Sequence, residues 1–317
     1  MTFEQIKKLQ HKIKENISQV IIGKDKVIDY ILISLFCSGH VLLEDVPGTG
    51  KTVLSKALAK SIDCNFKRIQ FTPDLLPSDL TGINYYNQKQ GEFCFRPGPI
   101  FTNILLADEI NRATPRTQSS LLECMEEKQV TIDGDTKVLN QPFFVIATQN
   151  PIETQGTFPL PEAQLDRFFM KLKIGYPTKE EGKRILDRFQ TDNPLMRIKT
   201  VASAEEILEA QQSVLTVKVS DTVKGYILDI IEATRNHHKI VHGISPRGSL
   251  ALMKASQVLA IFRGRDFVTP DDVKEVAVPV LSHRIIHNDY VVSNSTEHAE
   301  MIIREILQTV PVPAENI

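Results

Sequence analysis

Apolar residues recur along the chain with two different periods, which predict helices and strands in alternation. Residues 3–20 carry apolar side chains in steps of three and four, the spacing of an amphipathic helix, and residues 26–38 indicate a second, more buried helix. Short apolar runs predict five strands, at 40–44, 67–71, 103–108, 142–148 and 169–174. Helical segments such as 114–127 fall between several of these runs. This alternation favours a parallel sheet covered by helices on both faces.

Two further segments have the pattern of β-hairpins inserted into that scheme. Residues 82–96 place Gly91 between two strand-like runs, and residues 129–139 place the turn-forming pair Asp133-Gly134 between two others. The first hairpin carries four aromatic residues, Tyr85, Tyr86, Phe93 and Phe95. They could grip a polypeptide, or they could pack across the two strands and onto the core.

The rear part of the chain changes to helical periodicity after Tyr176-Pro177. The expected helices are 179–190, 203–215, 220–236, 247–262, 270–281 and 296–308. Ser203, Ser220 and Thr269 are suitable N-cap residues for several of them. We therefore expect an α/β core with N-terminal helices at 1–190 and a helical domain at 191–317.

Charge and composition exclude several classes of protein. The 317 residues include 37 basic and 39 acidic ones, so no chain-wide basic field attracts nucleic acid or anionic membrane, although a local basic groove stays open. The most apolar segment, 30–43, is interrupted by polar residues and is shorter than the roughly 20 residues of a membrane span. The four cysteines form no Cys-x-x-Cys pair. With no targeting segment at the N-terminus, these features favour a cytoplasmic protein with reduced thiols.

A glycine-rich loop between the first strand and the next helix is the most informative stretch. It comprises Asp45, Val46, Pro47, Gly48, Thr49, Gly50, Lys51, Thr52 and Val53. Glycines let backbone N–H groups approach phosphates closely, Lys51 would reach the β- and γ-phosphates, and the Thr52 hydroxyl would hold Mg²⁺. Asp45 stands where the usual pattern has a glycine, and Pro47-Gly48 can supply a rigid turn instead. The loop predicts binding of ATP or ADP with Mg²⁺.

Two adjacent carboxylates end the strand at 103–108. In an open α/β sheet, residues at the carboxyl ends of strands face the ligand site. Asp108 is suited to orient Mg²⁺, and Glu109 to polarise a water molecule for attack on the γ-phosphate.

These features together resemble the MoxR-type AAA+ ATPases over nearly the whole chain. Besides the phosphate loop, the matching motifs are DEINRA at 108–113, LLECMEE at 121–127, ATQNP at 147–151, LPEAQLDRF at 160–168 and GISPRG at 243–248. The resemblance implies a P-loop α/β core with a five-stranded parallel sheet and inserted hairpins, followed by a helical lid. It also implies an ATP-hydrolysing ring, usually a hexamer, that remodels or activates protein clients. Such proteins often promote metal or cofactor insertion and commonly act with a partner bearing a von Willebrand factor A domain.

The resemblance also implies roles for three residues outside the loop and the acidic pair. Asn150 matches the sensor 1 position, where an amide can bind the γ-phosphate or the attacking water. Arg167 matches the arginine finger, which reaches a neighbouring subunit's phosphate with a planar, permanently charged group. Arg247 matches sensor 2 and would reach the phosphates from the lid. Arg112 and Arg116 could contact the next subunit.

Three other functions remain open beside the protein-remodelling ATPase. A nucleic-acid motor would need basic hairpins, but the first hairpin offers only Lys89 and Arg96, so no nucleic-acid partner is expected. A magnesium-chelatase-like motor subunit is close in sequence. A scaffold that binds ATP but barely turns it over is disfavoured by the intact set of Lys51, Asp108, Glu109, Asn150 and Arg167.

Overall fold

A five-stranded parallel sheet lies at the centre of the computed structural model, which describes residues 1–151, 156–190, 193–288 and 295–313. Its strands are β1 (Val41–Glu44), β2 (Phe66–Gln70), β5 (Ile104–Asp108), β8 (Phe144–Gln149) and β9 (Met170–Leu172). They lie in the order β2-β5-β8-β1-β9, and every neighbouring pair is parallel. The loops that follow the strands therefore meet at one end, the carboxyl end of the sheet, and the loops that precede them meet at its amino end.

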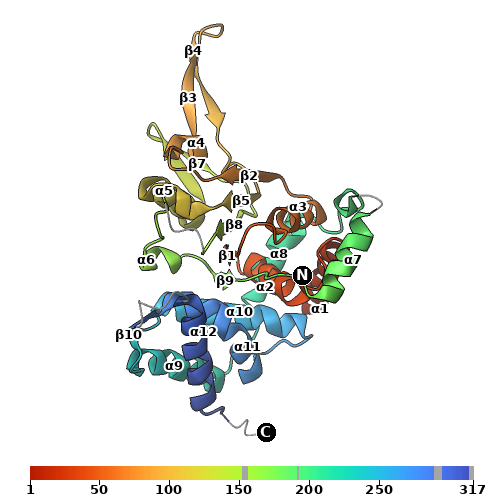
Figure 1. Cartoon of the computed structure of the whole chain (residues 1–317), viewed down its shortest axis with the longest axis vertical. Coiled ribbons are helices and arrows are strands. Elements are labelled where there is room, and N and C mark those ends of the chain that lie inside the picture. The colour runs from red at the N-terminus through yellow and green to blue at the C-terminus, as the bar shows by residue number, and fades with distance from the viewer. Residues whose placement is uncertain (152–155, 191–192, 289–294, 314–317) are drawn as a thin grey trace.

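Alternate residues of the strands point to opposite faces of the sheet, and each face has its own helices. Val41 and Leu43 join one apolar cluster with α1, α2 and α3, whereas Leu42 joins a second cluster with α5. Figure 1 shows α3 and α5 on opposite sides of the sheet. The helices of the core are α1 (Phe3–Ser18), α2 (Asp25–Phe36), α3 (Lys51–Ser61), α4 (Pro77–Thr81), η1 (Ile110–Arg112), α5 (Pro115–Glu127) and α6 (Glu162–Leu165). The prediction of a covered parallel sheet is thus confirmed.

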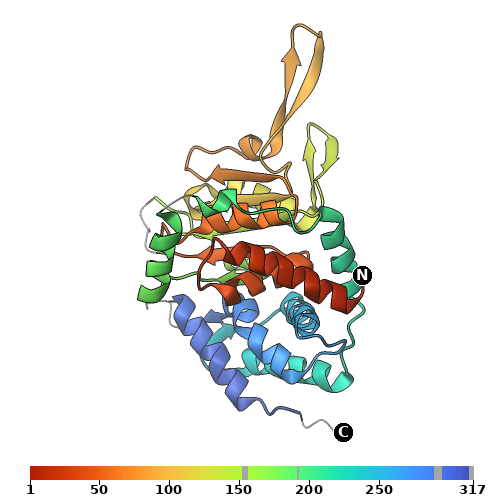
Figure 2. The same ribbon diagram turned by 90° about the vertical axis from the view of Figure 1, so that its right-hand side faces the viewer.

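Both predicted hairpins are present, and both project from the same end of the molecule (Figure 2). One consists of β3 (Gly82–Asn87) and β4 (Glu92–Pro97), the other of β6 (Gln129–Ile132) and β7 (Asp135–Val138). Asn84 of the first donates a hydrogen bond to Asp133 of the second at 2.8 Å. This contact fixes the longer hairpin beside the shorter one.

Helices dominate the rest of the chain, and those from α9 onward lie beyond β9 (Figure 1). The elements are α7 (Lys179–Phe189), η2 (Pro194–Met196), α8 (Ala204–Val214), α9 (Asp221–Asn236), β10 (Ile240–His242), α10 (Pro246–Phe262), α11 (Pro270–Leu281), η3 (Ser282–Arg284), β11 (Ile286–His287) and α12 (Ser295–Thr309). The apolar cluster of α1 and α2 continues into α10 and α11, so the α/β core and the lid pack around one continuous cluster of apolar side chains. The predicted domain boundary after residue 190 adjoins 191–192, which lie outside the described residues, and it stays a prediction.

Asp166, just before β9, anchors the lid to the core. Arg284 of η3 donates to the Asp166 carboxylate at 2.7 Å and to the Phe168 carbonyl oxygen, and Ser245, the N-cap of α10, also donates to Asp166. Burial lowers the pKa of Arg284 to about 10, against the opposing effect of Asp166, so the guanidinium is charged at neutral pH. Arg284 is buried and Asp166 is partly exposed, and their ion pair, with its further hydrogen bonds, joins η3 of the lid to the segment before β9.

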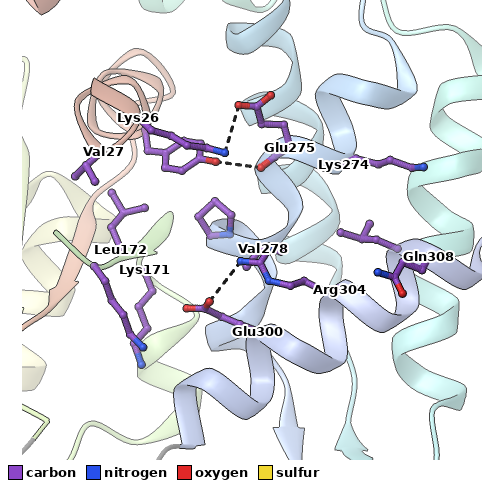
Figure 3. Close-up of a pocket in the computed structure, with 14 residues that line it drawn as sticks. Lys26, Val27, Lys171, Leu172, Lys274, Glu275, Val278, Glu300, Arg304 and Gln308 are labelled. Atoms are coloured by element: carbon purple, nitrogen blue, oxygen red, sulfur yellow. Dashed lines mark hydrogen bonds and ion pairs between the residues drawn. The ribbon is translucent and has the colours of Figure 1, made fainter. Parts of the chain in front are cut away.

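A charged pocket marks the outer side of the same junction, between α2 and β9 of the core and α11 and α12 of the lid (Figure 3). Lys26 faces Glu275 across the junction at 3.7 Å, and the Tyr30 hydroxyl donates to the Glu275 carbonyl oxygen at 3.2 Å. Within α12, Arg304 pairs with Glu300 at 3.6 Å. The carboxylates of Glu275 and Glu300 thus pair with neighbouring cations, and the contacts of Lys26 and Tyr30 with Glu275 join α2 to α11.

His40 connects the amino end of the sheet to the end of α5. It is buried, its Nδ1 accepts the Val145 N–H at 3.0 Å, and its Nε2 lies 3.0 Å from the Met125 carbonyl oxygen. These partners require a neutral ring with the proton on Nε2. Burial lowers the pKa of His40 to about 4. Protonation would point a new N–H at the Val145 N–H.

We expect acid to weaken the fold through His40. Because the pKa of His40 is lower in the folded chain than in the unfolded one, the unfolded state binds more protons as pH falls from about 6.5 to about 4. The cost should reach about 3 kcal/mol below that window. Urea unfolding at several pH values should show a steep loss for the wild type and a shallower one for His40→Gln. His11→Gln, at an exposed position, should follow the wild type.

Candidate active site

The phosphate loop turns from the carboxyl end of β1 into the first turn of α3. Gly48 and Gly50 have φ values of 85° and 90°, and a Cβ built on either would meet no atom within 4 Å. The loop thus presents its backbone to open space at a helix N-terminus, as a polyphosphate requires. The Lys51 ammonium donates to the Asp45 carbonyl oxygen at 2.9 Å. The loop geometry fits a nucleotide phosphate, and Lys51 must leave this carbonyl to reach one.

Asp45 connects the loop to two neighbouring strands. It is buried, and its carboxylate accepts the N–H groups of Ile174 and Gly175, the latter at 3.1 Å. Its own N–H donates to the Gln149 carbonyl oxygen at 3.2 Å. These bonds explain why β9 ends at Leu172, before the predicted end of its run at 174. The Asp45 carboxylate, at the position where glycine is usual, therefore ties the start of the phosphate loop to the segment after β9.

The two carboxylates at the end of β5 are already engaged in this structure. Asp108 accepts the Thr148 hydroxyl at 2.6 Å and pairs with Arg68 of β2 at 2.7 Å. The Glu109 carboxylate accepts the Gln70 amide at 2.7 Å and pairs with Arg112 at 2.9 Å. Its backbone is left-handed, with φ 57° and ψ 51°, a conformation that a glutamate rarely adopts.

The carboxyl end of β8 brings the predicted sensor residue into the same region. Asn150 follows Gln149 directly and is half-buried. Gln149 donates to the Glu44 carboxylate at 2.7 Å, and Lys171 pairs with the same carboxylate at 2.8 Å. Burial alone would raise the pKa of Glu44, but the Lys171 ammonium and the hydrogen bonds hold it below the usual value. Glu44 therefore stays ionised beside the phosphate loop.

The oxygen donors at this end of the sheet are chemically suited to a hard cation. Thr52, in the first turn of α3, offers a hydroxyl, and Asp108 offers a carboxylate. Mg²⁺ prefers such oxygens and keeps several waters and phosphate oxygens as further ligands. A magnesium ion would also have to compete with Arg68 for Asp108.

Arg167 and Arg247 lie at the opposite end of the sheet. Both pair with Glu126, near the end of α5, Arg167 at 3.4 Å from its Nε and Arg247 through its terminal nitrogen. Glu126 follows Met125, whose carbonyl oxygen contacts His40, and His40 precedes β1 whereas the phosphate loop follows it. One chain thus places the loop, the acidic pair and Asn150 at the carboxyl end, but both arginines at the amino end.

Several residues that shape this site were not predicted from the sequence. Arg68 and Gln70 alternate on β2 and bind the two carboxylates of the neighbouring β5. Glu126 was part of a recognised motif but had no assigned role. The sequence shows that Arg68 and Gln70 point to the same side of β2, but it does not show that β2 lies beside β5.

Comparisons with known proteins agree with this geometry. Residues 40–170 match the ATPase family associated with various cellular activities (AAA), and residues 232–306 match the AAA lid domain. Chaperone MoxR1 of Mycobacterium tuberculosis is 40% identical over 95% of this chain and 81% of its own length. The chain belongs to the MoxR family of AAA+ ATPases.

Other relatives of this MoxR-family chain match it over nearly its full length. YeaC of Bacillus subtilis, an uncharacterised protein, is 50% identical over 99% of this chain and 98% of its own. A crystal structure of a candidate ATPase from Cytophaga hutchinsonii superimposes with a TM-score of 0.89 at 40% identity, covering 98% of this chain and 97% of the other. The predicted fold class, an AAA+ core followed by a helical lid, is therefore confirmed. None of the helices described for this MoxR-family chain has the length and apolar character needed to cross a bilayer.

Proposed function

We propose that this chain hydrolyses ATP in a homo-oligomeric ring, a hexamer, and uses the cycle to remodel or activate protein clients. The observation that carries the proposal is the separation of the site into two halves. The loop, Asp108 and Glu109 lie at one end of the sheet, and Arg167 and Arg247 lie at the other; in this proposal each complete site is therefore built from two neighbouring chains.

The residues of one chain bind the nucleotide and activate the water. The N–H groups from Gly48 to Thr52 bind the phosphates, and Lys51 exchanges the Asp45 carbonyl oxygen for phosphate oxygens. Thr52 and Asp108 would hold Mg²⁺, which would supply positive charge to the phosphate oxygens. Glu109 leaves Gln70 and Arg112 and accepts the proton of the attacking water, which Asn150 orients.

The neighbouring chain supplies the cations that offset charge in the transition state. Arg167 is the arginine finger in this proposal. Arg247, predicted to reach the phosphates from the lid, shares Glu126 with Arg167, and we propose that it serves the same neighbouring site. Guanidinium groups stay charged and present paired donors. Two of them therefore suit the negative charge on the γ-phosphoryl group as it is transferred to water.

The longer hairpin is the surface that we propose for client contact. Tyr86 and Phe93 pack edge to face across the two strands, with ring centroids 5.4 Å apart, but they do not pack onto the core: Phe93, Tyr86 and Tyr85 are 74%, 54% and 43% exposed. Phe95 differs, because its ring packs on Phe101 at 5.3 Å and lies under the Lys137 ammonium. Three of the four predicted aromatics thus keep exposed surface that suits apolar peptide segments, as exposed apolar patches commonly do. We also propose a von Willebrand factor A domain partner, metal or cofactor insertion as one outcome, and a cytoplasmic location.

The proposed function is tested by phosphate release per subunit over a range of protein concentrations. We expect the rate per subunit to rise with concentration, because the site is completed only by assembly. We expect a further rise when unfolded α-casein is added as a model client. A rate that is independent of concentration and of casein would instead indicate a monomeric nucleotide switch.

The hairpin has its own prediction. Replacing Phe93 and Tyr86 together by serine should leave the basal ATPase rate unchanged and weaken the apparent affinity for casein by about tenfold or more. Lys89→Ser, at the exposed hairpin turn, is the matched control and should keep the wild-type affinity. Casein titrations of ATPase rate measure both. Equal affinities for the two variants would assign the client surface elsewhere.

A further inference from the structure

Glu126 is the one residue of the described chain that both Arg167 and Arg247 contact through ion pairs. The three side chains come from different places: Glu126 from α5, Arg167 from the segment before β9, and Arg247 from the first turn of lid helix α10. They are 38%, 32% and 47% exposed, so each is partly packed and partly open to a partner.

Two guanidinium groups that contact the same carboxylate lie close together, and they would repel each other without that anion. Glu126 supplies that anion, and it lies on a helix of the core that is fixed to the sheet by the His40–Met125 contact. The Asp166–Arg284 pair and Ser245 hold the start of α10 close to the core. They do not set the direction of the Arg247 side chain, whose ion pair among the described residues is with Glu126.

We propose that Glu126 is a positioning residue for ATP hydrolysis at the neighbouring subunit: it holds Arg167 of the core and Arg247 of the lid side by side as one double-cation face. This inference rests on the proposed function, because it presupposes a site shared between two chains. The face keeps a net positive charge, since two guanidinium groups outweigh one carboxylate, and it remains attractive to a triphosphate. Glu126 touches neither nucleotide nor water, and it acts through the two arginines.

The same carboxylate links the lid to the hydrolysis step. Arg247 belongs to the lid and Arg167 to the core, so a lid that rotates away from the core separates the two arginines at Glu126. Misplacing a catalytic group by about 1 Å can cost on the order of 10²-fold in rate. Glu126 thus makes the arginine face depend on the position of the lid.

The first test compares Glu126→Gln with Glu127→Gln, which removes the same charge from the adjacent exposed position of α5. We expect Glu126→Gln to lower kcat by about 10- to 100-fold, with the KM for ATP within about twofold of wild type. Glu127→Gln should keep the wild-type kcat. Thermal melting and size-exclusion chromatography of both variants should match the wild type, since Glu126 lies near the exposed end of a helix.

The second test mixes two variant proteins so that they assemble together. If Glu126 positions arginines for the neighbouring chain's site, only certain mixtures should recover ATPase activity. Lys51→Ala destroys its own nucleotide site but retains an intact arginine face. Adding it to Glu126→Gln should therefore restore part of the activity, since the intact face completes the Glu126→Gln nucleotide site. Adding Arg167→Ala to Glu126→Gln should restore nothing, because both chains then carry a defective face.

The outcomes separate this inference from the proposed function. Recovery with Lys51→Ala and none with Arg167→Ala supports the positioning role. Recovery of activity in the mixture of Arg167→Ala with Lys51→Ala supports the shared site. If that mixture recovers, the role of Glu126 is overturned by either of two results: a wild-type or higher kcat for Glu126→Gln, or no rescue of Glu126→Gln by Lys51→Ala. If Arg167→Ala with Lys51→Ala does not recover, the shared site itself fails.

Discussion

Arg167→Ala should lower kcat by about 10³- to 10⁵-fold while leaving nucleotide binding nearly intact. Arg167 lies at the amino end of the sheet, away from the phosphate loop of its own chain, so it contributes nothing to binding there. It acts on the phosphoryl group of the neighbour only as charge develops in the transition state. An interaction made only in the transition state lowers kcat and kcat/KM together. Single-turnover phosphate release, with nucleotide binding measured separately, distinguishes the two effects.

Arg167→Lys is the matched control for this prediction. Lysine retains the charge but lacks the planar fork, so it should recover only a small part of the lost rate. Melting temperatures should change little, because the Arg167–Glu126 pair is partly exposed and such pairs contribute on the order of 1 kcal/mol or less. A kcat for Arg167→Ala within severalfold of wild type would remove Arg167 from the catalytic set.

The strands and the phosphate loop were predictable because their signals are local. Val41 to Leu43 form an uninterrupted apolar run, as a strand buried on both faces requires, and Gly48 and Gly50 occupy left-handed positions that other residues rarely adopt. Both hairpins followed from turn residues between strand-like runs. In each case the deciding interactions join residues close together in the sequence.

The contacts that complete the site were not predictable, because they join residues far apart in the chain. Gln70 reaches Glu109 only because β2 and β5 are neighbours in the sheet. Glu126 meets Arg247 across 121 positions, and nothing in a single sequence pairs one carboxylate with one arginine at that distance. Phe93 and Phe95 share one face of β4, so the exposure of Phe93 and the packing of Phe95 depend on which of them lies next to Phe101, a contact that the local pattern does not give.

Glu109→Gln is expected to lower the rate of ATP hydrolysis by about 10²- to 10⁴-fold and to leave a chain that still binds ATP. A glutamine has nearly the same shape but cannot accept the proton of the attacking water. It also loses the charge that pairs with Arg112, so Arg112 no longer competes for the side chain. The variant should therefore hold ATP in assembled rings for long periods, and rapid-quench measurement of bound ATP and ADP checks this.

Gln70→Ala tests the same carboxylate from the opposite side. The Gln70 amide holds Glu109 at 2.7 Å in this structure, so Glu109 must leave it before activating water. Removing the amide eliminates one of the two partners that hold Glu109 back, and the basal rate should stay level or rise. A fall as large as that of Glu109→Gln would mean that Gln70 positions the base for reaction. Wild-type hydrolysis by Glu109→Gln would exclude Glu109 as the base, whatever Gln70→Ala does.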